Sequence, residues 1–383
     1  MSRLAQQHRV VHMDFGISSP VMFAARALRH DPSQLFSPRR LWSDGILKRA
    51  AAGELYVGSS WGPPGLDLLS QTNRIRGHFT YDEKVRIAGE WLKREGISDA
   101  IIWVYHPGFG EAPFRLPRKL LVYDCVDEYT AFPAYRKCKE WLAAREQKLC
   151  ENADLVFCTA PALYERKRVF NPGGTHYVHN VGDAGHFKRA LDERTKVPSD
   201  VAALPKPVIG FVGAVSNYKL NIDWLLELAR TRPNYQLCLI GPIGVSDPST
   251  NVSALKAQPN VHVLGTRDYA VLPEYMKGFD VAVIPYRLNE YTESVFPIKF
   301  FEYLATGKPV VVSRLPALQG FLGSVSVADD AASFVAECDR ALGSPGSGSA
   351  ERVALAEANS WSSRVSALMA LIEQKLSSKR GTR

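Results

Sequence analysis

The chain has 383 residues, of which 46% are hydrophobic and 22% are charged, and its formal net charge is +8. This length allows two domains with independent cores, and the composition is ordinary for a globular protein. Met1–Phe15 lacks the apolar core of a signal peptide, and no apolar run approaches the roughly 20 residues of a membrane-spanning helix. The basic charge favours an anionic partner, which the composition alone leaves open between a sugar nucleotide, a nucleic acid and a membrane surface.

The six cysteines form no Cys-x-x-Cys pair, and several lie in apolar runs, as Cys238 does between Leu237 and Leu239. We therefore expect reduced, buried thiols in a cytoplasmic protein. No His/Cys or Asp-x-Asp cluster calls for a metal, so none is expected.

In the first half, short β-branched runs alternate with longer helical patterns, which predicts a parallel sheet with helical crossovers. We expect strands at Arg9–Asp14, Leu55–Val57, Ala100–Tyr105, Lys119–Asp124, Asp154–Thr159 and Thr175–Val178. Helices are expected at Val21–Arg29, Asp82–Arg94 and Pro133–Glu151. The intervals His30–Gly53 and Trp61–Gly65 are predicted to be loops.

A second series follows the polar segment Arg194–Pro207, which we take as a linker. Its expected strands are Val208–Val212, Gln236–Ile240, Val261–Leu264, Val281–Ile284 and Val310–Val312. Its expected helices are Ile222–Arg230, Ala270–Lys277, Ile298–Thr306 and Ala331–Leu342, followed by a loop at Gly343–Ser349. A final helix carries Trp361, Val365, Leu368, Ile372 and Leu376 on one stripe.

The segment Thr292–Val311 is the most informative part of the sequence. Pro297 suits a first helical turn, and Lys299 and Glu302 lie side by side on one face of the predicted helix. A helix N-terminus with a nearby lysine attracts an anion, and an acidic residue one turn on can accept hydrogen bonds from two ribose hydroxyls. The alternative is an ordinary surface ion pair between Lys299 and Glu302.

This segment resembles the donor-site helix of group 1 glycosyltransferases with the GT-B fold. More narrowly, it is similar to that of bacterial enzymes of capsule, teichuronic-acid and exopolysaccharide assembly. Other landmarks agree in order and spacing. Val178–Phe187 resembles the Asn-Gly-Val-Asp…Phe signature between the domains, Gly210–Gly213 resembles the glycine turn that opens the nucleotide domain, and Asp280–Tyr286 resembles the strand before the donor helix.

The resemblance implies an α/β protein of two Rossmann-like domains facing each other across a cleft. Residues 1–195 would bind the acceptor, residues 205–355 the nucleotide-sugar donor, and residues 356–383 would form a helix that crosses back to the first domain, and a tail. The implied donor contacts are Gly213, Lys219, Tyr286, Ser294, Lys299 and Glu302. For Lys219 the spacing after Gly213 also fits a plain exposed lysine.

The implied function is transfer of a sugar from a nucleotide-sugar donor to a saccharide or lipid-linked saccharide in bacterial surface polysaccharide synthesis. Retaining relatives often carry two glutamates at the donor helix. Here the earlier position is Ser294, and Glu293 is one residue off. The pattern is similar to the Lys-x-x-Glu/Gln version of some inverting enzymes, so we favour inversion, with no metal or other cofactor.

A second constellation, Val122–Tyr129, places Asp124, Asp127 and Glu128 after a predicted strand, at the edge where ligands bind in open α/β sheets. Inverting transfer needs a carboxylate that takes a proton from the acceptor hydroxyl. By the resemblance, Asp127 aligns with the catalytic aspartate of inverting relatives, with Asp124 and Glu128 as neighbours that raise its pKa. Alternatively, Asp124 caps the following loop and Glu128 faces solvent.

Two further features are weaker. His106 ends another predicted strand and is either an acceptor-side residue or a satisfied loop histidine. The cluster Phe114–Lys119, with Arg74 and Arg76, mixes basic and apolar residues. It predicts either peripheral contact with the inner face of the cell membrane or a lipid-linked acceptor, or else an ordinary solvated basic face.

Two rival functions differ in class. A Rossmann-type oxidoreductase is disfavoured because no Gly-x-Gly-x-x-Gly turn follows the first strand of either half. A non-catalytic scaffold that binds sugar nucleotides remains open. Nucleic acid is not expected as a partner, because aromatic and basic residues do not interleave along any predicted strand.

Overall fold

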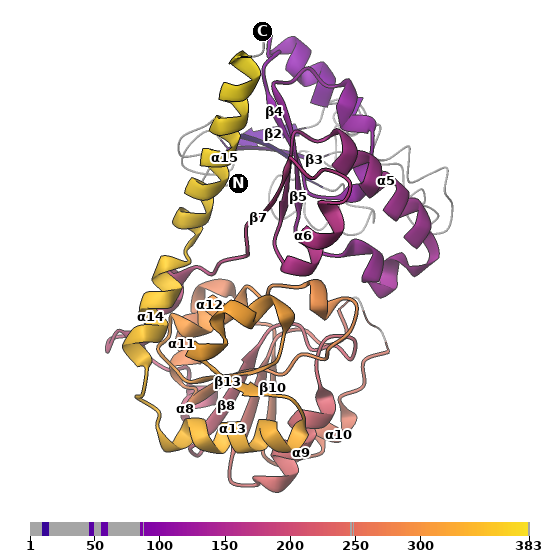
Figure 1. The fold of residues 1–383 in the computed structure, drawn as a ribbon. Coiled ribbons are helices and arrows are strands. Elements are labelled where there is room, and N and C mark those ends of the chain that lie inside the picture. Colours follow the sequence, from indigo (N-terminus) through magenta and orange to yellow (C-terminus); the bar gives the residue numbers. More distant parts are fainter. Residues whose placement is uncertain are drawn as a thin grey trace, which may run out of the picture.

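The computed structural model describes residues 10–14, 46–49, 55–59, 85–86, 88–245, 247 and 249–381. Within these residues the strands form three sheets, with three, four and six strands. The two larger sheets lie one above the other in Figure 1, and a long C-terminal helix runs past both.

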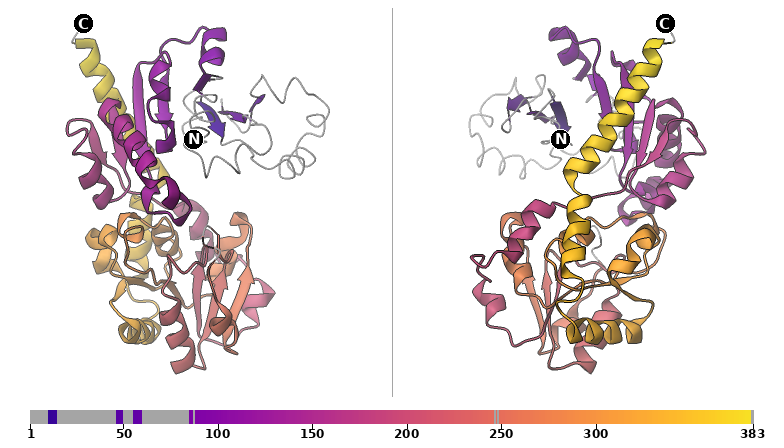
Figure 2. Two further views of the ribbon diagram at one scale, coloured as in Figure 1. Left: turned by 90° about the vertical axis from the view of Figure 1, so that its right-hand side faces the viewer. Right: turned by 60° about the vertical axis from the view of Figure 1, so that its left-hand side comes forward.

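The small sheet comprises β1 (Val10–Asp14), β2 (Ile46–Arg49) and β3 (Leu55–Ser59), in the order β1-β3-β2. It lies to one side of the four-stranded sheet in Figure 2. β1 pairs with β3 in parallel and β2 pairs with β3 antiparallel. The prediction of a loop over residues 30–53 is therefore wrong at β2, a short segment whose strand structure depends on pairing with β3. The predicted helix Val21–Arg29 and loop Trp61–Gly65 lie outside the described residues, as do Arg74 and Arg76.

The four-stranded sheet is parallel, as predicted, in the order β4-β5-β6-β7. Its strands are β4 (Ile101–Val104), β5 (Leu120–Cys125), β6 (Leu155–Cys158) and β7 (Thr175–Tyr177). Its helices are residues 88–94, α5 (Lys139–Asn152) and α6 (Pro161–Lys167). Short 3-10 helices lie at Pro107–Phe109, Ala112–Arg115, Tyr129–Ala131 and Pro133–Cys138.

Strand β5 is buried along its whole length because both faces of its sheet are covered. Leu121 and Tyr123 share a core cluster with Leu149 of α5 and Leu163 of α6. Leu120 and Val122, which alternate with them, share another cluster with Leu368 and Ile372 of the last helix. The carboxyl end of β5, where Asp127 follows, is thus held from two sides.

The six-stranded sheet is also parallel, in the order β10-β9-β8-β11-β12-β13. Its strands are β8 (Val208–Val212), β9 (Gln236–Ile240), β10 (Val261–Gly265), β11 (Val281–Ile284), β12 (Val310–Ser313) and β13 (Ser326–Ala328). When these strands are numbered 1 to 6 along the chain, starting at β8, their order in the sheet is 3-2-1-4-5-6, which is the order of dinucleotide-binding sheets. The sequence predicted five of these strands and missed β13, a short edge strand that pairs with β12 alone.

The helices of this half are α9 (Ile222–Thr231), α10 (Ser253–Lys256), α11 (Leu272–Lys277), α12 (Lys299–Leu304), α13 (Ala331–Gly343) and α14 (Ser349–Ala358). Helix α14 was not predicted. Short 3-10 helices lie at Tyr269–Val271, Thr292–Ser294 and Pro316–Ser324. The segment before β8 forms α7 (Ala184–Phe187), a 3-10 helix at Lys188–Leu191 and α8 (Ser199–Ala202), and its first two elements lie against α11. The domain limits at 195, 205 and 355 remain a prediction.

The last helix, α15 (Trp361–Gly381), crosses from the six-stranded sheet to the four-stranded one, as predicted (Figures 1 and 2). The chain also passes between the halves after β7, and the two crossings pair through a bridge between Gly182 and Ser360. Arg364, 5% exposed, donates to the carbonyl oxygens of Val178 and His179. Its Nη2 lies 3.5 Å from Oδ1 of the buried Asp124. One arginine therefore ties α15 to both the crossing segment and β5.

Replacing Arg364 by methionine should destabilise the protein strongly, because it leaves Asp124 buried without a cation and two carbonyl oxygens without a donor. Loss of one partner of a buried ion pair costs about 3–5 kcal/mol. The free energy of unfolding is measured by urea denaturation of the full chain. Arg340→Met is the matched control, since its ion pair with Glu337 is exposed on the arginine side and worth about 0–1 kcal/mol. Equal stability of the two variants would contradict this role of Arg364.

Candidate functional site

The order of the six-stranded sheet reverses between β8 and β11, and ligands of such sheets bind in the crevice outside the carboxyl ends of the strands at this reversal. The chain leaving β8 carries Gly213 and Lys219, and the chain leaving β11 carries Tyr286. Lys299 is the first residue of α12. Three of the predicted donor-site side chains thus start from one edge of the sheet.

Lys219, Tyr286 and Lys299 form what we call the lysine–tyrosine cluster. Tyr286 is 1% exposed, and Lys299 Nζ donates to its hydroxyl over 2.6 Å. The charge of Lys219 acts on the same phenol. Each lysine Nζ lies 5.1 Å from the centroid of the Tyr286 ring. The prediction of an exposed lysine at 219 is therefore wrong, and the structure brings Lys219 to the same phenol as Lys299.

The cluster places two ammonium groups against one phenol, with the carboxylates of Asp127 and Glu302 acting on them from outside it. Burial and the charge of Lys219 lower the pKa of Lys299, against the opposing effect of Tyr286. Burial would raise the pKa of Tyr286, yet the two ammonium groups lower it below its ordinary value. Burial would also lower the pKa of Lys219, but Tyr286, Tyr218 and Asp127 raise it. Two cations held against one phenol favour binding of an anion.

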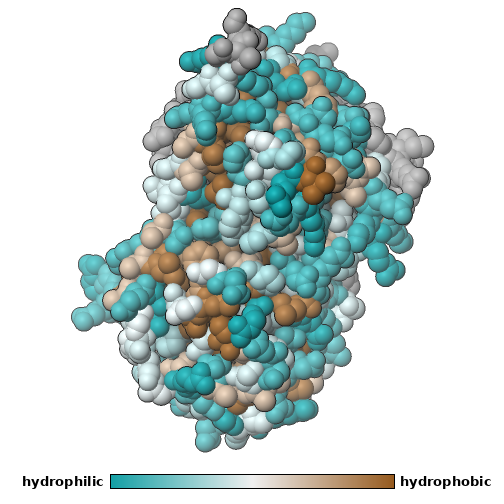
Figure 3. All heavy atoms as spheres, viewed as in Figure 1, coloured by the Kyte–Doolittle hydropathy of each residue, from teal (hydrophilic) through white to brown (hydrophobic). Residues whose placement is uncertain are grey.

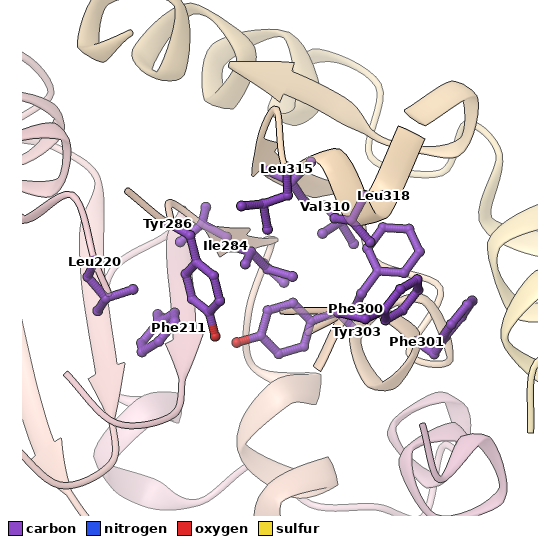
Figure 4. Packing of buried hydrophobic residues seen from close by; sticks show 14 of the residues in the cluster. Phe211, Leu220, Ile284, Tyr286, Phe300, Phe301, Tyr303, Val310, Leu315 and Leu318 are labelled. Atoms are coloured by element: carbon purple, nitrogen blue, oxygen red, sulfur yellow. The ribbon is translucent and has the colours of Figure 1, made fainter. Parts of the chain in front are cut away.

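Helix α12 is anchored by its apolar face, which leaves Lys299 and Glu302 on the other face. Phe300, Phe301 and Tyr303 are fully buried. The N–H of Val212 at the end of β8 donates to the Tyr303 hydroxyl over 2.7 Å. Figure 4 shows the hydroxyls of Tyr286, just after β11, and of Tyr303 in α12 pointing toward one another. The helix, and with it Lys299, is therefore fixed against the carboxyl ends of β8 and β11.

Glycine is required where the turns after β8 and β9 meet. Gly213 has a φ of +145°, and a Cβ there would lie 2.9 Å from Lys299 Nζ. Gly241 has a φ of +141°, and its Cβ would lie 2.1 Å from the carbonyl oxygen of Gly213. Gly213 thus leaves the space that the Lys299 ammonium occupies, and Gly241 leaves room for the carbonyl of Gly213.

Glu302 lies near Lys299 but does not share an ion pair with it. Its carboxylate accepts a hydrogen bond of 3.2 Å from the Tyr269 hydroxyl, while the Lys299 ammonium is bound to Tyr286. Burial raises the pKa of Glu302 to about 7, with Asp183 adding to the rise and Lys299 and Tyr269 opposing it. The interpretation of Lys299 and Glu302 as an ordinary surface ion pair is therefore wrong.

Ser294, the remaining donor-side candidate, is fully buried, and its hydroxyl donates to the backbone oxygen of Glu290 over 3.2 Å. The structure thus gives this serine a partner inside its own loop. It occupies the position of the first glutamate of retaining relatives without supplying a charge.

Asp127 reaches the lysine–tyrosine cluster from the other half of the molecule. It follows β5, and its carboxylate is electrostatically coupled to Lys219 and to Tyr291, which lies in the loop between β11 and α12. Burial raises the pKa of Asp127 to about 6, while the charge of Lys219 and the Tyr291 hydroxyl oppose the rise. A carboxylate with this pKa is mostly ionised at neutral pH and still basic enough to accept a proton.

The two acidic neighbours of Asp127 have other partners. Asp124 accepts a hydrogen bond of 3.3 Å from Trp103 Nε1 besides its contact with Arg364, and burial raises its pKa to about 6. Glu128 is 3% exposed, so the interpretation that it faces solvent is wrong. The expectation that these neighbours raise the pKa of Asp127 is also wrong, because burial is what raises it.

Glu128 belongs to a buried ionic network that the sequence did not reveal. Lys167 Nζ lies 3.4 Å from Glu128 Oε2 and 2.7 Å from Glu146 Oε2. Tyr123 donates to Glu146 over 2.5 Å, and Arg166 lies 3.0 Å from Glu128. Burial would raise the pKa of Glu128, but Lys167, Thr130 and Arg166 lower it. The network anchors the loop beside Asp127 to α5 and α6.

His106 is 4% exposed and uses both ring nitrogens. Nδ1 accepts from the N–H of Gly108 over 3.0 Å, so that Nε2 carries the proton and donates to the Tyr135 hydroxyl over 3.1 Å. This geometry favours the satisfied loop histidine over an acceptor contact.

The cluster Phe114–Lys119 does not form an apolar basic surface. Leu116 is buried, Arg118 donates to the carbonyl oxygens of Phe114 and Leu116, and Lys119 lies 2.6 Å from Asp99. The structure therefore gives no support to membrane contact through this cluster. The face shown in Figure 3 is mainly hydrophilic with smaller hydrophobic patches. Helices in the described part of the chain fall short of the length and apolarity needed to cross a bilayer.

Among the described residues, no group of three or more His, Cys, Asp or Glu side chains is arranged to hold a metal ion. The described cysteines are free thiols, as predicted, and all except the half-buried Cys138 are buried.

Comparison with known proteins agrees with this architecture. Residues 206–344 match the family model of the glycosyl transferases group 1. TuaH of Bacillus subtilis (strain 168), provisionally named a teichuronic acid biosynthesis glycosyltransferase, is 25% identical over 258 residues. The match covers 64% of this chain and 64% of TuaH, which is less than two thirds of the relative's length.

Solved structures match almost the whole chain. Sucrose-phosphate synthase from Thermosynechococcus elongatus has a TM-score of 0.66 at 17% identity, over 96% of this chain and 99% of its own. The trehalose-6-phosphate protein from E. coli bound with UDP-2-fluoro glucose has a TM-score of 0.65 at 13% identity, over 95% and 98%. A further structure, of trehalose-6-phosphate synthase, concerns glycosyltransfer with retention. The predicted architecture is confirmed: the chain has the GT-B fold, and its residues 206–344 match the group 1 glycosyl transferases.

Proposed function

We propose that this protein is a glycosyltransferase, which moves a sugar from a nucleotide-sugar donor to a saccharide or lipid-linked saccharide acceptor. The observation that carries the proposal is the meeting of a cationic cluster and a basic carboxylate from opposite halves of a GT-B fold. The match to TuaH supports a role in bacterial surface polysaccharide synthesis. Such a reaction would take place in the cytoplasm, where we also place the protein.

The lysine–tyrosine cluster suits the diphosphate of the donor. Two ammonium groups stabilise the negative charge that develops on the departing nucleoside diphosphate, so the transfer requires no metal in this proposal. When the diphosphate binds, it replaces Tyr286 as the hydrogen-bond acceptor of Lys299 and as the partner of the Lys219 ammonium. Glu302 would accept hydrogen bonds from the ribose hydroxyls, one helical turn beyond Lys299.

Asp127 is the proposed general base. In the proposed reaction its carboxylate takes the proton of the acceptor hydroxyl as the oxygen attacks the anomeric carbon, and the bond to the diphosphate breaks on the opposite face. Inversion of the anomeric carbon results. Ser294 supports this route over the retaining one, because it places no carboxylate at the earlier position of the donor loop.

The rival functions are weaker. A non-catalytic scaffold requires the cationic cluster but gives no reason for Asp127 to be held beside it. An oxidoreductase requires a glycine-rich dinucleotide turn after β8, where the sequence is Gly213-Ala-Val-Ser.

The donor site is tested by Lys219→Met and Lys299→Met. Each change removes a charge-assisted contact to the diphosphate and should weaken UDP binding by about 1.5–3 kcal/mol, or more than tenfold. A thermal-shift panel of UDP, GDP, ADP, CMP and dTDP derivatives first identifies the preferred nucleotide. Isothermal titration calorimetry then measures the affinity of each variant for that nucleotide, which replaces UDP if the two differ. Lys188→Met is the control, since Lys188 forms an exposed ion pair with Glu357. Wild-type affinity in both cluster variants would place the donor elsewhere.

The base is tested by Asp127→Asn, which keeps the size of the side chain but cannot accept a proton. Donor binding should remain near normal while turnover falls about 10²–10⁴-fold. In the wild type, kcat/KM should fall as the pH drops through about 6, because protonation of Asp127 removes the base. The control, Asp329→Asn, alters only an exposed ion pair with Arg314. Turnover of Asp127→Asn close to wild type would eliminate Asp127 as the base.

A further inference from the structure

The segment that carries the chain from the first half into the second lies directly against the donor helix α12. The ring of His179 stacks on that of Phe296, with centroids 5.1 Å apart, and Asn180 Nδ2 donates to the backbone oxygen of Phe296 over 3.1 Å. Phe296 is 1% exposed and lies just before α12. The crossing segment is thus attached to the start of the helix that carries Lys299 and Glu302.

Gly182 brings the backbone of this segment against the backbone of the helix. A Cβ at residue 182 would lie 2.8 Å from the backbone nitrogen of Glu302 and 3.0 Å from the carbonyl carbon of Phe301. Both atoms belong to the main chain of a helix, so neither can turn aside as the end of a flexible side chain can. Any side chain at residue 182 would therefore push the crossing segment and Glu302 apart.

The crossing segment has partners on its other side as well. Gly182 is buried and forms a bridge with Ser360, the residue before α15. The carbonyl oxygens of Val178 and His179 accept hydrogen bonds from Arg364 of α15. The segment is therefore held between α15 and α12, with little room to move away from the donor helix.

The same part of the chain reaches Glu302 by a second route, through Tyr269. The rings of His186 and Tyr269 are stacked, with centroids 4.7 Å apart and planes inclined by 12°. His186 Nε2 donates to the backbone oxygen of Tyr269 over 2.9 Å. The Tyr269 hydroxyl in turn donates to Glu302 Oε1 over 3.2 Å. Contacts that start from the crossing segment and from α7 directly after it thus act on both the backbone and the carboxylate of Glu302.

We propose that Gly182 and His186 are positioning residues for Glu302, which hold its carboxylate where the ribose of the donor binds. The inference rests on the proposed function and deepens it, because it names what fixes the nucleoside end of that site. Neither residue touches the ligand, and each acts through the donor helix or through Tyr269. Since Gly182 lies where the chain joins the two halves, recognition of the ribose depends on the geometry of that crossing.

The test compares two ligands that differ only in the ribose, UDP and its 2′,3′-dideoxy form, with the preferred base in place of uracil if the two differ. Hydrogen bonds to a carboxylate are worth roughly tenfold or more in affinity, so the wild type should prefer UDP by at least that factor. In Gly182→Ala the preference should fall about fivefold or more, because the added Cβ displaces Glu302. Isothermal titration calorimetry measures both affinities in the full chain.

Gly185→Ala is the matched control. Gly185 follows Gly182 closely in the chain, but a Cβ there meets only Asp183 Oδ1, at 3.8 Å. This variant should keep the wild-type preference for UDP.

His186→Ala is the second variant, and it decides the outcome if Gly182→Ala does not fold. It removes the ring that stacks on Tyr269 and should also reduce the preference for UDP, by about twofold or more. An equal loss of affinity for both ligands, with an unchanged preference, is what general destabilisation produces and would overturn the positioning role. Wild-type affinities for both ligands would overturn it as well.

The wild type and Glu302→Ala separate this inference from the proposed function. The preference for UDP should disappear in Glu302→Ala. A wild type that binds both ligands equally would contradict the proposed ribose contact of Glu302 itself, and the inference with it. A preference that is lost in Glu302→Ala but unchanged in Gly182→Ala and His186→Ala would overturn the positioning role alone. Because the preference is measured without turnover, absence of sugar transfer would contradict the proposed reaction and leave the positioning role standing.

Discussion

The site depends on the cost of holding two lysine ammonium groups against one buried phenol. Lys219 and Lys299 repel each other, and burial adds a desolvation penalty that lowers the pKa of Lys299. The fold sustains this arrangement because the Tyr286 ring lies against both ammonium groups, its hydroxyl accepts from Lys299, and α12 is anchored by three buried aromatic rings. Gly213 provides the space that the Lys299 ammonium needs, and Gly241 makes room for the Gly213 carbonyl. In the proposed function, the donor diphosphate relieves this repulsion by replacing the phenol as the partner of both lysines.

The second constraint is that the proposed chemistry draws on both halves of the molecule. Asp127 follows β5 of the four-stranded sheet, whereas Lys219 and Tyr291 belong to the six-stranded half. The chain crosses between the halves twice, once after β7 and once where it enters α15. Arg364 of α15 holds the two crossings together, because it donates to the carbonyl oxygens of Val178 and His179 in the first crossing. The same arginine neutralises Asp124, three residues before Asp127. The element that joins the halves thus also stabilises the end of the strand that carries the proposed base.

Sequence patterns predicted those strands and site residues whose positions depend on nearby sequence. The strands of the six-stranded sheet are short apolar runs between turns, which the sequence shows directly. Lys299, Glu302 and Asp127 each lie close to such an apolar run, so their places at the edge of a sheet could be predicted together with the strands. Strands β2 and β13 were missed because each is a short strand that depends on a single neighbour for pairing. Tyr291, Arg364 and the Lys167–Glu146 pair were missed because their partners lie far away in sequence. A tyrosine three residues from Ser294 carries no mark of its ring contact with Phe132 of the other half.

The most direct test of the account is the configuration of the sugar first released during slow hydrolysis of the bound nucleotide sugar. With Asp127 as the base, it activates a water molecule in place of the acceptor, and the anomeric carbon is attacked once, from the face opposite the diphosphate. Proton NMR of the fresh product, recorded before the free sugar mutarotates, distinguishes the two anomers. The account predicts the anomer inverted relative to the donor. Release of the anomer that retains the donor configuration would contradict it.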